Sequence, residues 1–106
     1  MIIGILTMKF IYIKNYLDLS REEKFNFFKF LGNTDKMTVS HQRVVFGENA
    51  LLLEFKGDTN IEEAKENIES FFKKRPEISV HVVNRIIQNK DTMILEFTNK
   101  KLRVRR

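Results

Sequence analysis

The residue types that most often carry catalysis or bind metals are scarce in this 106-residue chain. It has no cysteine and only two histidines, His41 and His81. Without cysteine there is no disulfide, no thiolate metal ligand and no thiol nucleophile. A zinc site needs three or four ligands, so two histidines alone do not predict one. We expect both histidines to be polar surface or interface residues, and we predict no metal and no other cofactor.

Sequence motifs for phosphate binding and nucleophilic catalysis are also missing. The four glycines are isolated, whereas a phosphate-binding loop needs them clustered so that backbone amides can approach the ligand. No serine lies in the G-x-S-x-G pattern of a nucleophile elbow. An enzymatic alternative would rest on Asp18 or on the two histidines, with no third group to complete a site. We therefore predict a protein without catalytic residues.

The charge that could contact a polyanion is concentrated at the end of the chain. The sequence has 19 Lys and Arg against 14 Asp and Glu, a net charge of +5. Five of the basic residues lie in the last seven positions, so residues 1–99 have no net charge. Such a cluster predicts salt-sensitive, sequence-independent binding to phosphates, although a solubilising terminus is the alternative. The predicted nucleic-acid-binding residues are Lys73, Lys74, Arg75, Lys100, Lys101, Arg103, Arg105 and Arg106.

Two helices are predicted to help position these residues, and the first has a clear start. Ser20 can accept a hydrogen bond from the backbone amide of Glu23, whose side chain can reach back to the serine. The helix is expected to extend to Leu31, because Gly32 and Asn33 favour termination there. Its wide apolar stripe is expected to lie in the core. The stripe consists of Phe25, Phe27, Phe28, Phe30 and Leu31.

The second helix has the clearest periodicity in the chain. Apolar residues from Ile61 to Phe72 repeat at 3.6-residue spacing, and charged residues fill the opposite face. Either Thr59 or Asn60 can supply its N-terminal cap. Pro76 follows its basic end and cannot continue the helix.

Short runs of β-branched and aromatic residues predict the strands. They are Lys9–Lys14, Met37–Phe46, Ala50–Lys56, Ile78–Val83 and Met93–Thr98. The order of elements predicts an α+β fold with a ferredoxin-like split βαβ arrangement, which is βαββαβ plus an extra C-terminal strand. Two helices would then cover one face of an antiparallel sheet, with the first and third strands in its middle. The last hairpin would extend one edge, and the other face would be uncovered.

The length of the chain and the absence of a linker predict one domain. We expect residues 1–99 to form a single α+β domain and residues 100–106 to form a basic tail or an edge strand. The edge strand is favoured by Leu102 and Val104, which alternate with basic residues.

The apolar segment Met1–Thr7 does not predict export or membrane insertion. It is shorter than the apolar part of a secretory signal and no basic residue precedes it. The sequence also has no run of 18 apolar residues. We expect a cytoplasmic protein with no membrane partner, starting at Met1 or at Met8.

The strand Met37–Phe46 carries both apolar and polar residues on each face. A strand mixed in this way often packs against another subunit, although an ordinary edge strand blunted by Arg43 is the alternative. We favour a homodimer interface on one face of the strand. Its residues would be Met37, Val39, His41, Arg43 and Val45.

Together these features predict a non-catalytic binding or assembly domain that associates with nucleic acid through its basic C-terminal segment. The alternative is a homo-oligomeric regulatory or adaptor module with no role at nucleic acid.

Overall fold

The computed structural model describes residues 9–34, 37–88 and 90–105. The predictions for Met1–Thr7, for a start at Met8 and for Arg106 lie outside these ranges. The helices are α1 (Arg21–Gly32) and α2 (Ile61–Phe71), and short 3-10 turns are formed by Tyr16–Asp18 and Phe46–Glu48. The strands are β1 (Lys9–Lys14), β2 (Val39–Val45), β3 (Ala50–Phe55), β4 (Ser79–Val83), β5 (Arg85–Gln88), β6 (Thr92–Glu96) and β7 (Lys101–Arg105).

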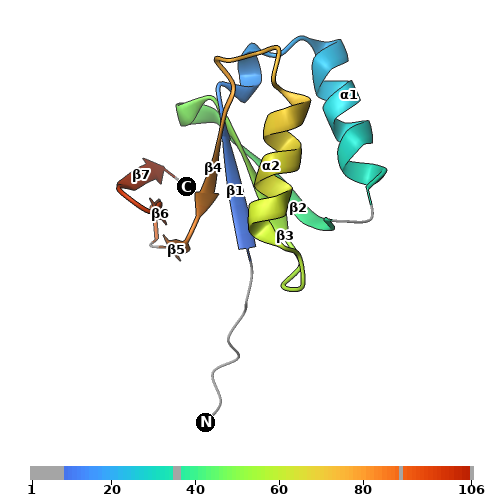
Figure 1. The fold of residues 1–106 in the computed structure, drawn as a ribbon. Coiled ribbons are helices and arrows are strands. Elements are labelled where there is room, and N and C mark those ends of the chain that lie inside the picture. Colours follow the sequence, from blue (N-terminus) through green and yellow to red (C-terminus); the bar gives the residue numbers. More distant parts are fainter. Residues whose placement is uncertain (1–8, 35–36, 89, 106) are drawn as a thin grey trace.

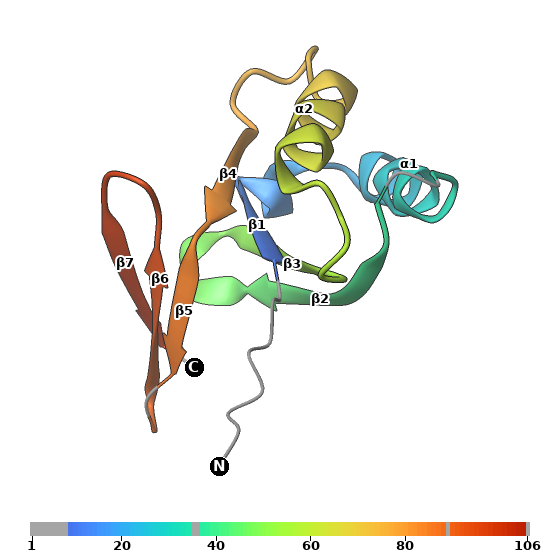
Figure 2. The ribbon, with the colours of Figure 1, turned by 60° about the horizontal axis from the view of Figure 1, so that its bottom comes forward.

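The strands form two antiparallel sheets. The first sheet has the order β2-β3-β1-β4, with β1 and β3 in its centre, and the second has the order β5-β6-β7. Both helices lie on one face of the first sheet and the second sheet lies on the other side, which gives three layers (Figures 1 and 2). The predicted α+β class is confirmed.

The predicted number of strands and the place of the last hairpin were wrong. The chain leaves the first sheet at Asn84, whose backbone amide donates to the carbonyl of Glu96 at 2.7 Å. From there β5, β6 and β7 form a sheet of their own, so they do not extend the first one. They also cover the face that was expected to be uncovered, because apolar residues of both sheets pack together there.

The first core lies between the helices and the first sheet. Alternate residues of β1 and β3 point toward the helices, as the two-residue period of a strand requires. Phe27 and Leu31 of α1 pack on them from one helix, and Ala64 and Ile68 of α2 from the other. The buried strand residues of this core include Ile11, Ile13, Leu51, Leu53 and Phe55.

The predicted starts of both helices are confirmed. The Ser20 hydroxyl accepts from the amide of Glu23 at 3.1 Å, and the amide of Ser20 donates to the Glu23 carboxylate at 2.8 Å. At the start of α2 the side chain of Asn60 accepts from the amide of Glu63 at 3.1 Å, which selects Asn60 as the cap.

The prediction that the whole phenylalanine stripe of α1 is core was wrong for two of its members. Phe27 and Leu31 lie four residues apart on the side that faces the sheet. Phe25 and Phe28 lie outside that side, and they are 59% and 60% exposed. Because the helix presents more apolar surface than the sheet can cover, part of the stripe is left at the surface.

The second core lies between the two sheets. Tyr12 and Val83 contribute from the first sheet, and Met93, Leu95 and Val104 contribute from the second. Burial in this core, with a smaller effect of the Glu48 carboxylate, raises the pKa of Tyr12 to about 12. Within the described residues, neither helix is long and apolar enough to cross a bilayer.

Candidate functional site

The predicted nucleic-acid-binding residues are divided among three places in the structure. Lys101, Arg103 and Arg105 lie on β7, the edge strand of the second sheet. Lys100 lies in the turn before β7, beside Lys65 of α2 and His81 of β4. Lys73, Lys74 and Arg75 follow the C-terminal end of α2. The structure therefore does not bring the predicted residues into one patch.

The outer face of the second sheet carries one coherent group of basic residues. Met93, Leu95 and Val104 face the second core, so the residues that alternate with them face outward. On β5, Ile86 packs against the same core and its two neighbours face outward. We call this surface the outer basic face. Its residues are Arg85, Ile87, Thr92, Ile94, Glu96, Lys101, Arg103 and Arg105.

One carboxylate, that of Glu96, forms ion pairs with two of the four basic residues on this face. Glu96 pairs with Arg85 on one neighbouring strand at 3.0 Å and with Lys101 on the other at 3.3 Å. Arg103 and Arg105 have no ion-pair partner among the described residues, and both are exposed. The two arginines therefore offer their charge to a ligand without first breaking an internal pair.

The prediction missed Arg85 as a member of this group. Its contribution depends on β5, a strand that the sequence analysis did not predict. Arg85 lies directly opposite Glu96, and Glu96 lies directly opposite Lys101. The local signal was the run Arg85–Gln88, where two adjacent isoleucines point to opposite faces of a strand.

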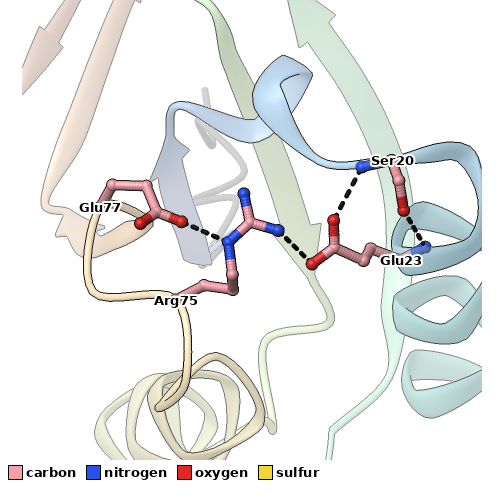
Figure 3. Close-up of polar contacts among 4 residues, drawn as sticks. All are labelled: Ser20, Glu23, Arg75 and Glu77. Atoms are coloured by element: carbon pink, nitrogen blue, oxygen red, sulfur yellow. Dashed lines mark hydrogen bonds and ion pairs between the residues drawn. The ribbon is translucent and has the colours of Figure 1, made fainter.

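Arg75 has a structural role that its position in the sequence did not show. Its guanidinium donates to the carboxylates of Glu77 and of Glu23, which connects the segment after α2 to the first turn of α1 (Figure 3). The hydrogen bond from Arg75, followed by that from the amide of Ser20, lowers the pKa of Glu23 to about 2. Arg75 also lowers the pKa of Glu77. Arg75 is thus already neutralised by two carboxylates.

The predicted interface residues do not share one face of β2. Val39 lies opposite Phe55, but His41 lies opposite the adjacent Glu54, so Ser40 is an extra residue in the strand. Such a β-bulge changes which side of the sheet the following residues face. Val39 packs against the first core, whereas His41 faces the second sheet.

Burial within the chain also divides the predicted interface. Met37 is buried in the first core and Val45 in the second, so neither is available to a second subunit. His41 and Arg43 are exposed and line a cavity of about 410 Å³ between the two sheets.

The structure keeps the two histidines apart. His41 lies on β2 and His81 on β4, which are the opposite edges of the first sheet. Three strand spacings separate these edges, about 14 Å. Burial, with smaller contributions from Lys100, Lys65 and Lys14, lowers the pKa of His81.

The other group considered for catalysis is also part of a local structural contact. The carboxylate of Asp18 accepts a hydrogen bond from the side chain of Asn49 at 2.9 Å. Asn49 has a positive φ of 51°, and its side-chain oxygen accepts from the amide of Leu17 at 2.6 Å. In the described part of the chain, no three histidine or carboxylate side chains converge as metal ligands would.

Comparison of the chain with protein-family models, with curated proteins and with solved structures found no significant match in any of the three.

Proposed function

We propose that this chain is a non-catalytic binding domain whose helices and first sheet form a ferredoxin-like unit. The order β2-β3-β1-β4, with antiparallel pairing throughout, supports this arrangement. Both helices connect strands that are not neighbours in the sheet, as a split βαβ unit requires. The second sheet is an addition that carries the binding surface.

The proposed ligand is nucleic acid, and the proposed site is the outer basic face. The observation that carries this proposal is that four cations, on β5 and β7, share one face with a single carboxylate. Alternate residues of a strand are about 7 Å apart, so Lys101, Arg103 and Arg105 form a row of regularly spaced cations. Ile94 lies on β6 between Arg103 and Ile87, which follows Arg85 on the same face of β5, and the two isoleucines offer apolar contact to sugars or bases.

The chemistry of this face favours phosphates over carboxylate-bearing side chains as the main contact. Arginine binds phosphate through two parallel hydrogen bonds, and several such contacts release condensed counterions from a polyanion. Binding should therefore be strongly salt-dependent and nearly independent of base sequence. Such a surface binds a nucleic-acid strand without recognising its base sequence.

The test is fluorescence anisotropy with a short labelled single-stranded oligonucleotide at several salt concentrations. Replacing both Arg103 and Arg105 by glutamine should weaken binding and lower the slope of log K against log salt. For two lost phosphate contacts on a single strand, the slope should fall by about 1.4. Unfolding midpoints of the variant and the parent should agree, because both arginines are exposed and form no ion pair with any residue that the structure describes.

The matched control removes two other predicted cations, Lys73 and Lys74, in the same way. Both are exposed at the end of α2 and away from β7. An unchanged slope in this control, with a lowered slope in the arginine variant, supports the outer basic face. Equal losses in the two double variants would show that only net charge matters, and the proposed site would be wrong.

A second candidate function is self-association through α1 and β2. The observation that favours it is the exposure of Phe25 and Phe28 next to β2, an edge strand of the first sheet. Exposed aromatic groups beside an edge strand are typical of protein–protein contacts. Sedimentation equilibrium of the parent chain and of a Phe25→Gln, Phe28→Gln variant tests this. A monomeric parent chain at high concentration would exclude it.

A further inference from the structure

A second binding site is suggested by the cavity between the two sheets. It measures about 410 Å³ and lies between β2 and β3 of the first sheet and β5 and β6 of the second. Sites for small molecules typically measure about 300–1,000 Å³ and combine an apolar wall with a few polar groups. The cavity is on the inner side of the second sheet and shares with the outer basic face only Arg85, at its rim, so it does not depend on the function proposed above.

Two backbone irregularities border this cavity. The bulge at Ser40 turns His41 and Arg43 toward the second sheet. At Asn84 the chain passes from β4, which pairs with β1, into β5, which pairs with β6 of the second sheet instead. As a result the second core is closed around Tyr12, while Phe10, two residues earlier on the same strand, is only half-buried.

The inner wall of the cavity is apolar. It is formed by Phe10, Leu52, Ile86 and Met93, of which Leu52 and Met93 are buried in the second core. Phe10 and Ile86 are half-buried, so each presents apolar surface that the protein itself does not cover. An aromatic or aliphatic group placed against them would remove that surface from water, which favours binding.

The rim of the cavity is positively charged. It carries two arginines, Arg43 and Arg85, against one carboxylate, Glu54, and His41 adds a polar side chain. Arg85 is already paired with Glu96 of the outer basic face. No ion pair is found for Arg43 among the described residues, and its Nη1 lies 3.9 Å from the sulfur of Met93. The guanidinium is therefore held directly beside the apolar wall.

We infer that this cavity binds a small organic carboxylate with an apolar body, and that Arg43 binds its carboxylate. A planar guanidinium can donate two parallel hydrogen bonds to a carboxylate. The apolar body would lie against Phe10 and Ile86, whose apolar surface the protein itself leaves partly uncovered. The juxtaposition of an uncovered apolar wall and an arginine with no ion pair among the described residues is what selects this class of ligand, since a neutral or cationic compound would leave Arg43 without a carboxylate partner.

The test uses naphthalene-2-carboxylate as the probe, with chemical-shift changes of the folded chain as the readout. The expected result is saturable binding with the largest shifts at Phe10, Ile86 and Met93. The neutral alcohol of the same ring system, 2-naphthylmethanol, should bind at least about tenfold more weakly, because it lacks the charge that Arg43 recognises. This comparison needs no variant.

The Arg43→Gln variant should weaken binding of the carboxylate by at least about tenfold and leave binding of the alcohol unchanged. Arg103→Gln is the matched control, because it removes the same charge from the outer basic face. Equal binding of acid and alcohol, or equal effects of the two variants, would overturn the inference. So would shifts that map outside the cavity, or the lack of a saturable response with a Kd of about 1 mM or tighter.

Discussion

Replacing Leu95 by alanine tests whether the second sheet is joined to the first through a closely packed core. Leu95 is fully buried between the sheets. The change removes three carbon atoms, each worth about 0.8 kcal/mol on burial, and it leaves a cavity behind. Changes of this kind cost about 2.7–5 kcal/mol. That is a large part of the about 5–15 kcal/mol by which a domain of this kind is stable.

The assay is equilibrium unfolding in urea, followed by far-UV circular dichroism. Small proteins lose about 1–3 kcal/mol of stability per molar urea, so a loss of about 3 kcal/mol lowers the midpoint by about 1–3 M. The matched control is Ile94→Ala, at the preceding residue of β6. Ile94 faces outward and is only half-buried, so its truncation should cost about 1 kcal/mol or less.

Two results would refute this reasoning. Equal midpoints for the two variants would mean that the faces of β6 are assigned incorrectly. A separate early transition, which appears in Leu95→Ala and leaves most of the helical signal intact, would mean that the second sheet unfolds alone and contributes little to the first.

Three further predictions concern the ends of the helices and His81. Ser20→Ala removes the side-chain acceptor at the start of α1, so it should lower the free energy of unfolding by about 1 kcal/mol, measured in urea; an unchanged midpoint would contradict the role of the cap. Arg75→Gln should destabilise the protein near neutral pH and progressively less as the pH falls from about 4.5 towards 2. The folded-state pKa of Glu23 is depressed, so the stabilisation from its ion pair is present above the unfolded pKa and is lost on acidification. Midpoints that differ by the same amount at all pH values would contradict this. Lys100→Gln should raise the pKa of His81 part of the way to its ordinary value, since burial is the larger cause of its depression; an NMR titration with no change would exclude Lys100 as a contributor.

The features that the sequence predicted correctly are local. The capping residues Ser20 and Asn60 act within one helical turn, and the periodicity of α2 reports directly on the face that it buries. Neither depends on which strands become neighbours. The alternation of Leu102 and Val104 with basic residues is local in the same way, and those residues form β7.

The features that the sequence did not show depend on contacts between distant segments. The bulge at Ser40 exists only relative to β3, and it alone decides which residues of β2 face each core. The separation of the sheets at Asn84 likewise depends on pairing between β5 and β6. Because both were missed, the predicted interface and the predicted basic patch each combined residues from different surfaces.

The same dependence on distant contacts explains the role of Arg75. It lies beside Lys73 and Lys74 in the sequence, and all three are basic, so composition alone gives them one role. In the fold, Glu23 comes from a helix more than fifty positions earlier. A local pattern carries no information about such a partner.

The position of β1 has a consequence for the order in which parts of this protein open. It has a strand on each edge, β3 and β4, and an apolar core on each face. Its backbone amides can exchange hydrogen with solvent only when both layers around it have separated, which approaches complete unfolding. Amides of the edge strands β2 and β7 need only local fraying. Deuterium uptake should therefore proceed from these edges inward, and β1, although it comes first among the elements, should be among the last to take up label, together with β3, which is central in the same way.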